Sequence, residues 1–259
     1  MTGLLRGALD PIRQNEVAEL KVYAHGRLPA PPEQRPVPAV GDWLMLGNGP
    51  DPTLTAHGSV PVGDCTIAAA AHAVMAANAE VGTSDPTPDA NQAVAQYLAL
   101  TGGADTGCVE ADVLTAWQQH GLFDGNRIAA FAPVDHTSLL DVHQAVAAYG
   151  FAYLGVALPA SAERQFAAGL PWTYTGDRPV GGHAILLAGY DPQWAYAVTW
   201  GAVTAVSYPW LAAYCTEAWA VIPAEFIEAG RGPEVAVDQL QDDISSLAER
   251  RRPFCHPAS

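Results

Sequence analysis

Residues 63–80 read GDCTIAAAAHAVMAANAE, and this stretch decides the fold. From Cys65 onward it is rich in alanine, the residue with the highest helix propensity, so it predicts a buried helix over 65–80. Asp64 stands where the N-cap residue is expected. Cys65 then lies in the first turn, where the positive end of the helix dipole lowers the pKa of a thiol. The stretch is typical of a reactive cysteine, although a cysteine in an alanine-rich helix is more often a small buried hydrophobic residue.

A second stretch, residues 181–191, reads GGHAILLAGYD. Its branched and aromatic residues predict a strand over 183–190 with His183 at its start. Gly181 and Gly182, without side chains, would let the backbone of a substrate approach closely. An imidazole beside Cys65 would complete a thiolate–imidazolium pair, the activated form of a cysteine nucleophile.

The remaining elements change in character along the chain. Periodicity and propensity predict helices over 87–100, 109–120 and 137–149, followed by strands over 151–158, 194–200, 203–208 and 218–222. A short helix is expected near 209–215, and a polar helix over 235–250. Because helices come first and strands later, we expect an α+β fold, with an N-terminal helical half packed on a mostly antiparallel sheet half.

Composition excludes several classes of protein. The chain has 259 residues, of which 49% are hydrophobic, which is enough to form a core. Twelve Lys and Arg against 27 Asp and Glu give a net charge of −15, which argues against binding to nucleic acid or to anionic membranes. No apolar run approaches membrane-spanning length, and the first residues do not resemble a secretory signal. We therefore expect a protein that is cytoplasmic when synthesised, or one that ends in a virion.

Metal and cofactor chemistry is not expected. The four cysteines lie far apart without a CxxC pair, and no HExxH motif occurs. The acidic excess is expected to be a solvated surface, and His72, on the Cys65 side of its helix, is expected to be a core histidine. Other side chains have ordinary structural interpretations: inert thiols at Cys108, Cys215 and Cys255, solvent-facing histidines at His136 and His143, and a core or shielding role for Trp200.

Three segments are expected along the chain. Residues 28–39 read RLPAPPEQRPVP, so 1–40 is expected to be a proline-rich arm, extended and unable to join a helix or a central strand. Such an arm could cover a cleft or serve as an attachment. A compact domain is expected over 41–226, followed by a C-terminal helix and tail over 227–259.

Five motifs occur in one order: LGN (46–48), GDCT (63–66), DTG (105–107) with Trp117, GGH (181–183) and TWG (199–201). Over about residues 43–223 the sequence resembles the papain-like cysteine peptidase superfamily, and it is most similar to uncharacterised bacterial and phage members. The resemblance implies a papain-like fold in which Cys65 is the nucleophile and His183 the general base. It also implies hydrolysis or transfer at a peptide or amide bond.

Two positions depart from the family pattern. The family has an asparagine that orients the histidine, and here the corresponding positions are Val198 and Thr199, of which only Thr199 carries a hydrogen-bonding group. The family also places a glutamine six residues before the nucleophile as an oxyanion donor. That position is Ser59, and Asn48 of the LGN segment resembles the equivalent donor, displaced by an insertion before Cys65.

Three functions remain open at this point. The first is a cysteine peptidase or amidase with Cys65, His183, Thr199 and Asn48 in its site, no cofactor, and a peptide or peptidoglycan-like substrate. The second is a catalytically impaired papain-like protein of a phage particle, with assembly partners bound through the N-terminal arm and the C-terminal helix. The third is a cytoplasmic regulatory or toxin-related acyl transferase of the same fold.

Overall fold

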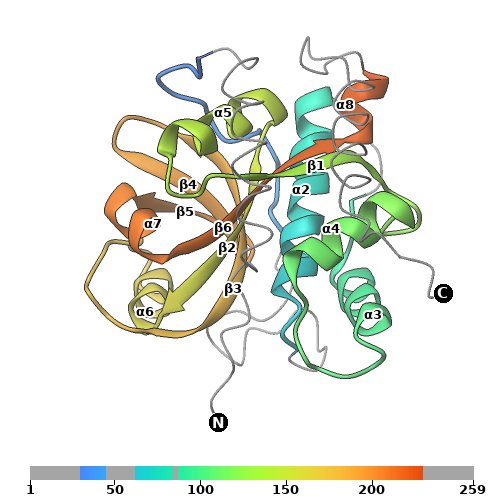
Figure 1. Ribbon diagram of the computed structural model, residues 1–259, viewed down its shortest axis with the longest axis horizontal. Coiled ribbons are helices and arrows are strands. Elements are labelled where there is room, and N and C mark those ends of the chain that lie inside the picture. The colour runs from blue at the N-terminus through green and yellow to red at the C-terminus, as the bar shows by residue number, and fades with distance from the viewer. Residues whose placement is uncertain (1–29, 45–61, 84–86, 230–259) are drawn as a thin grey trace, which may run out of the picture.

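A computed structural model describes residues 30–44, 62–83 and 87–229 of the chain. Three helices form one half of the domain: α2 (Cys65–Val81), α3 (Ala90–Leu100) and α4 (Glu110–Gln119) (Figure 1). They confirm the helices expected over 65–80, 87–100 and 109–120 to within three residues at each end. The expected helix over 235–250 and most of the expected C-terminal segment lie outside the described residues.

The other half is a six-stranded sheet. Neighbouring strands run antiparallel to each other, and their order across the sheet is β1-β6-β2-β3-β4-β5. The strands are β1 (Ile128–Val134), β2 (Ala152–Pro159), β3 (Pro179–Tyr190), β4 (Trp194–Thr199), β5 (Ala202–Ser207) and β6 (Cys215–Pro223). Along the chain, the first helices precede an antiparallel sheet, which confirms the predicted α+β class.

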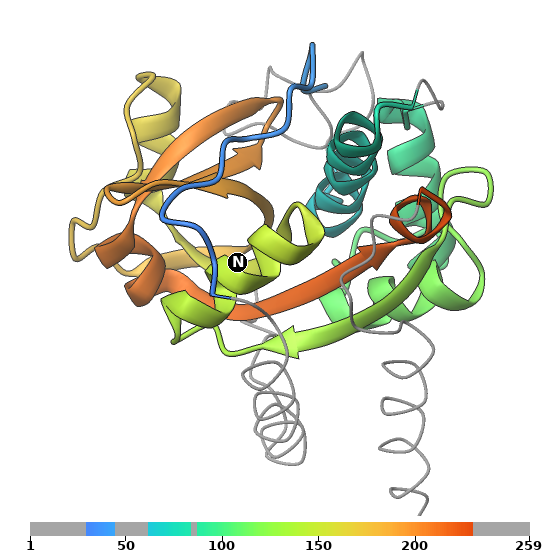
Figure 2. The same cartoon turned by 90° about the horizontal axis from the view of Figure 1, so that it is seen from above.

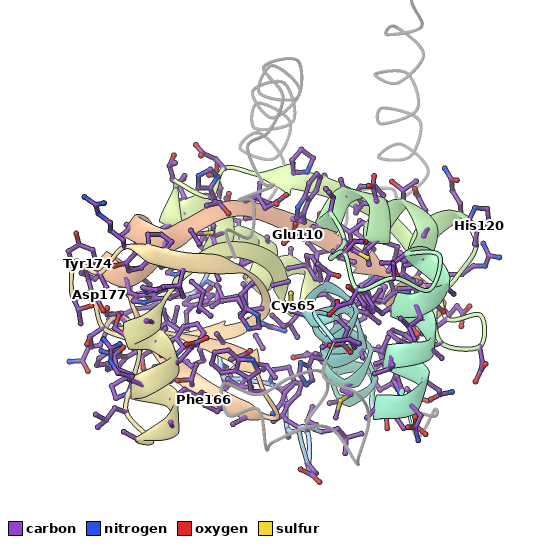
Figure 3. All side chains as sticks on the ribbon, turned by 90° about the horizontal axis from the view of Figure 1, so that it is seen from below. Cys65, Glu110, His120, Phe166, Tyr174 and Asp177 are labelled. Atoms are coloured by element: carbon purple, nitrogen blue, oxygen red, sulfur yellow. The ribbon has the colours of Figure 1, made fainter. Side chains whose placement is uncertain are left out.

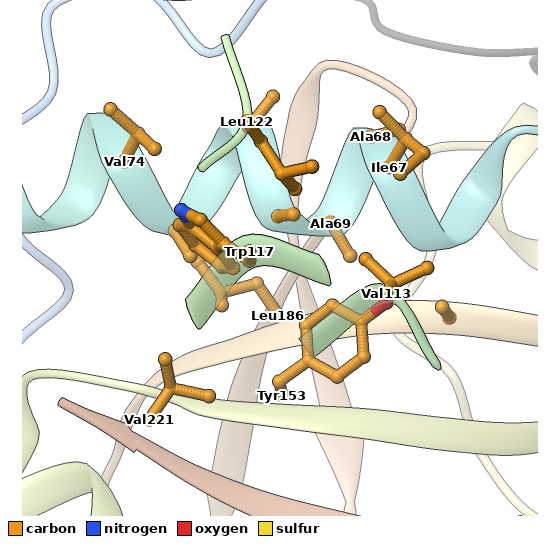
Figure 4. Close-up of a cluster of buried hydrophobic side chains, with 14 of the residues drawn as sticks. Ile67, Ala68, Ala69, Val74, Val113, Trp117, Leu122, Tyr153, Leu186 and Val221 are labelled. Carbon is orange, nitrogen blue, oxygen red and sulfur yellow. The ribbon is translucent and has the colours of Figure 1, made fainter. Parts of the chain in front are cut away.

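The sheet separates two hydrophobic cores. Along β2, Tyr153 packs with α2 and α4, whereas Ala152 and Leu154 belong to the cluster on the opposite face. This alternation follows from the two-residue period of a strand. Figure 4 shows Tyr153 between α2 and the sheet, beside Trp117 and Leu186. The opposite face is covered by α5 (Leu139–Tyr149), α6 (Ala160–Ala167) and α7 (Tyr208–Tyr214).

Three elements were missed by the sequence analysis: β1, α6 and the short α8 (Ala224–Glu228). β1 contains three alanines and Pro133, which weaken its strand propensity, and proline is tolerated there because β1 is an edge strand. Strand β3 also begins at Pro179, four residues earlier than expected. His183 therefore lies inside the strand, and its predicted place at the strand start is wrong.

Residues 30–44 of the N-terminal region pack against the domain (Figure 2). Arg35 and Tyr190 exchange two backbone hydrogen bonds of 2.8 and 2.9 Å, and Arg35 forms an ion pair of 2.9 Å with Glu80. Glu80 and Cys65 are fifteen positions apart on α2, which is about 22 Å of helix. Arg35 therefore lies at the opposite end of α2 from Cys65.

Candidate functional site

Helix α2 begins at Cys65, as the sequence predicts. The backbone carbonyl of Asp64 accepts hydrogen bonds of 2.9 Å from the N–H groups of Ile67 and Ala68. The expected cap by the Asp64 side chain is absent, and this carboxyl group is fully buried without a hydrogen-bond partner in the described part of the chain. Burial and nearby Asp105 raise the pKa of Asp64 to about 6, since both disfavour the carboxylate.

Two contacts hold the start of α2 in place. The Tyr153 hydroxyl on β2 donates to the backbone carbonyl of Thr66 at 2.8 Å. The Oδ1 atom of Asp105 accepts from the Gly63 N–H at 2.9 Å and from the Tyr97 hydroxyl at 2.6 Å. The DTG segment is thus tied to the GDCT segment through Asp105, and this fixes the position of Cys65.

His183 is oriented by Thr199 and Trp200. Its Nε2 atom lies 2.8 Å from Oγ1 of Thr199, and its ring stacks on Trp200 with centroids 4.8 Å apart. Thr199 ends β4 and pairs with Ala202, so Trp200 and Gly201 form a two-residue hairpin turn. Both have positive φ angles, 49° and 73°, as a type I′ turn requires. This turn places the Thr199 hydroxyl and the Trp200 ring against the imidazole of His183.

Cys65 and His183 line one cavity of about 830 Å³, between the helical half and the sheet. Figure 3 shows Cys65 at this junction. The Cys65 thiol has a backbone hydrogen bond with Ala184, the residue next to His183, so α2 and β3 meet at the two predicted catalytic side chains. The structure therefore brings Cys65, His183 and Thr199 together, with Thr199 behind the imidazole.

Burial opposes charge on both reactive groups. It raises the pKa of Cys65 to about 12, with smaller contributions from Glu110 and Asp64, and it lowers the pKa of His183 to about 4, with a smaller effect of His72. Both shifts favour the neutral thiol and the neutral imidazole. This is the reverse of the lowered thiol pKa that the position of Cys65 on the helix led us to expect.

The other predicted residues have different outcomes. Asn48 and Ser59, the two candidate oxyanion donors, lie outside the described residues. Val198 is fully buried in the core, and Trp200 is buried as expected. His72 is confirmed as a core histidine, because it is 1% exposed and its Nε2 atom is 2.9 Å from the Leu44 carbonyl.

The expectation that His143 faces solvent is wrong. Its ring stacks on Tyr190, with centroids 3.9 Å apart and planes 3° apart, and its Nε2 atom is buried. His143 lies on α5, which packs on the sheet face opposite α2, so it is on the far side of the sheet from Cys65. His136 is half-buried.

Sequence analysis missed two glutamates that line the cavity, Glu110 at the start of α4 and Glu217 on β6. Their exposed fractions are 7% and 5%, so these two do not belong to a solvated surface. No local motif marks them, because only the pairing of β2 with β6 brings Glu217 next to α4. Cys108, expected to be an inert thiol, also lines the cavity, and burial raises its pKa.

Within residues 30–44, 62–83 and 87–229, no cluster of three or more His, Cys, Asp or Glu side chains is arranged to hold a metal ion. No helix in these ranges is long and apolar enough to cross a membrane.

Solved structures with a similar fold are cysteine proteases. Xylellain, a cysteine protease from Xylella fastidiosa, superposes with a TM-score of 0.52 at 13% identity, over 75% of this chain and 87% of that one. The proform of Amb a 11, a cysteine protease and major ragweed pollen allergen, superposes with a TM-score of 0.51 at 15% identity, over 84% of this chain and 64% of that one. No protein-family model and no curated protein matches the sequence. The fold is thus that of papain-like cysteine proteases.

Proposed function

We propose that this chain is a cysteine peptidase or amidase that cleaves a peptide or amide bond, including bonds of the peptidoglycan type. The observation that carries the proposal is the hydrogen bond of His183 to Thr199 at the cavity that also holds Cys65. A nucleophile, a base and a group that orients the base are the three parts that covalent acyl transfer needs.

The proton steps follow from the geometry. With the His183 Nε2–H donating to the Thr199 hydroxyl, Nδ1 is the nitrogen left to accept a proton. The Cys65 thiol gives its proton to this nitrogen as sulfur attacks the carbonyl carbon, so a C–S bond forms. His183 then returns the proton to the leaving amine as the C–N bond breaks, and water hydrolyses the thioester with His183 again as the base.

The start of α2 supplies a donor for the oxyanion. The Cys65 N–H belongs to the first turn of α2, where backbone N–H groups have no partner within the helix. It can therefore donate to the negative oxygen that forms during attack. Asn48 is the second donor that we propose, by resemblance to the family.

The test is hydrolysis of fluorogenic peptide amides by the wild type and by Cys65→Ala, His183→Ala and Cys108→Ala. We expect the first two variants to lose activity by at least a hundredfold. Cys108→Ala, which removes another half-buried thiol from the same cavity, is the matched control and should stay active. Full activity in Cys65→Ala would refute the proposal.

A second candidate is a catalytically impaired papain-like protein with a structural role, for example in a phage particle. The observation in its favour is the burial that keeps both Cys65 and His183 neutral. Assembly would use the N-terminal arm and the C-terminal helix. It predicts a stable oligomer by light scattering and no hydrolysis of peptide amides, whereas hydrolysis that Cys65→Ala abolishes, in a monodisperse monomer, would exclude it.

A further inference from the structure

Trp200 restrains the His183 ring in a way that Thr199 does not. The hydrogen bond to Thr199 is made by Nε2, which lies close to the axis of rotation about the Cβ–Cγ bond. This bond by itself restrains the plane of the ring only weakly, because the χ2 angle of histidine has a broad range. The Trp200 ring lies against the face of the imidazole, with centroids 4.8 Å apart and planes 25° apart. Stacking on Trp200 therefore sets the plane of the imidazole.

Trp200 in turn has a conformation that other contacts must hold. Its φ angle is 49°, in the left-handed region that residues other than glycine rarely adopt. Two rings meet its indole edge to face: Phe166, with centroids 4.9 Å apart, and Trp172, with centroids 5.7 Å apart. Phe166 is half-buried on α6, whereas Trp172 is fully buried. Trp172 is therefore the contact that is shielded from solvent.

The backbone of Trp172 is fixed to the same hairpin that carries Trp200. Its N–H donates to the Ala205 carbonyl at 2.8 Å, and its carbonyl accepts from the Ser207 N–H at 2.9 Å. Both partners belong to β5, the strand that follows the turn at Trp200. Because two backbone bonds tie the two segments together, the Trp172 ring has a defined position relative to the Trp200 ring.

No polar contact explains the indole of Trp172. Its Nε1 atom is buried without a hydrogen-bond partner in the described part of the chain. An unpartnered buried donor is destabilising, and a phenylalanine would carry no such donor. What tryptophan adds at this position is the size of its ring, which reaches Trp200. Trp172 is not among the described residues that line the cavity, so it acts on His183 only through Trp200.

We propose that Trp172 is a positioning residue of the candidate site: it holds the Trp200 ring, which in turn holds the plane of the His183 imidazole. This inference rests on the proposed function, in which that imidazole accepts the proton of Cys65, but the packing of the three rings is measurable without turnover. A rotated imidazole misdirects its Nδ1 atom, and a displacement of about 1 Å at a reacting group can reduce the rate about a hundredfold.

The test compares Trp172→Leu with Trp210→Leu in the full-length protein. Trp210 is the matched control, because it is equally buried, its Nε1 atom also has no partner in the described part of the chain, and its ring contacts there are with Trp172 and Tyr214. Steady-state hydrolysis of a fluorogenic peptide amide gives kcat and KM. In Trp172→Leu we expect kcat to fall about tenfold with KM changed less than about twofold, and in Trp210→Leu we expect kcat within about threefold of the wild type.

A second measurement follows the imidazole directly. The ε1 carbon–hydrogen resonances of the histidines are recorded by NMR, and the His183 signal is the one that His183→Ala lacks. The ring current of the stacked indole shifts this signal, so its position reports the packing of the two rings. We expect the His183 signal to move in Trp172→Leu and to keep its wild-type position in Trp210→Leu. If either leucine variant does not fold, Trp172→Phe and Trp210→Phe are compared in the same way.

The outcomes separate the two proposals. An unchanged His183 signal in the Trp172 variant, or an equal displacement in both variants, overturns the role of Trp172. A displaced signal with unchanged kcat also overturns it, since the plane of the imidazole would then not matter for proton transfer. If the wild type cleaves no peptide amide but the signal moves only in the Trp172 variant, the peptidase proposal fails and the link from Trp172 to His183 stands.

Discussion

The Nε2 atom of His183 and the Oγ1 atom of Thr199 lie 2.8 Å apart, although sixteen residues separate them in sequence. Thr199 is 3% exposed, so water does not compete for this bond. A threonine hydroxyl therefore occupies the place where the resemblance implies an asparagine. It fixes the direction of the ring, and in the proposed mechanism the opposite nitrogen accepts the proton of Cys65.

Replacing Thr199 by valine keeps the shape and removes the hydroxyl. A hydrogen bond of this kind contributes about 1 kcal/mol, so we expect kcat/KM to fall roughly fivefold or more. Thr199→Ser should retain most of the activity. Thr204→Val, at another buried threonine on β5, is the control for loss of a buried hydroxyl. Unchanged activity in Thr199→Val would mean that the bond does not orient His183.

We expect the reactivity of Cys65 to depend on pH as that of an unactivated thiol does. Because burial raises its pKa to about 12, the thiolate fraction and the alkylation rate should rise about tenfold per pH unit from pH 5 to 9. Iodoacetamide labelling, measured for each cysteine by mass spectrometry, checks this, and Cys108 in the same cavity is the internal comparison. Rapid labelling of Cys65 at pH 5–6 that disappears in His183→Ala would show an ion pair instead.

Asp64 is expected to lower stability at neutral pH. Its pKa is raised from 3.8 to about 6 in the folded protein, so stability falls as the pH rises between these values and stays low above pH 6. Asp64→Asn should therefore be about 1–3 kcal/mol more stable than the wild type at pH 7, with a smaller difference near pH 4. Urea denaturation at both pH values measures this.

The control for Asp64→Asn is Asp89→Asn at the N-terminus of α3. Asp89 is exposed, and its side chain accepts from the Gln92 N–H at 2.8 Å, so it caps the helix as Asp64 does not. Asparagine caps about as well as aspartate, and little change is expected at either pH. Equal effects of the two substitutions would contradict the burial argument.

Asp105 should be needed for the shape of the site. Asp105→Ala leaves the Gly63 N–H and the Tyr97 hydroxyl without their acceptor, and we expect a loss of about 1–3 kcal/mol in the free energy of unfolding. Asp177→Ala, which removes an exposed ion pair of 2.9 Å with Arg164, should cost much less. Urea denaturation of both variants compares them, and equal losses would argue against a special role for Asp105.

The helical half was the most predictable part of the fold. Residues 65–80 combine high helix propensity with a glycine, Gly82, that ends the helix in the left-handed conformation. β1 was not predictable in the same way, since its alanines and Pro133 have weak strand preference and its pairing with β6 holds it in place. β1 pairs with β6 over nearly its whole length, across eighty residues of intervening chain.

The candidate site also has features that the sequence predicts and features that only the tertiary structure decides. Sequence alone pointed to Cys65, His183 and Thr199, because the GDCT, GGH and TWG motifs are local. The protonation of these groups and the meeting of Glu110 with Glu217 were decided only by the tertiary structure. A pKa depends on the burial of the group, and a pair of glutamates depends on the register of two strands sixty residues apart. Neither quantity is encoded in any short stretch of the chain, since both arise only when the helical half closes on the sheet.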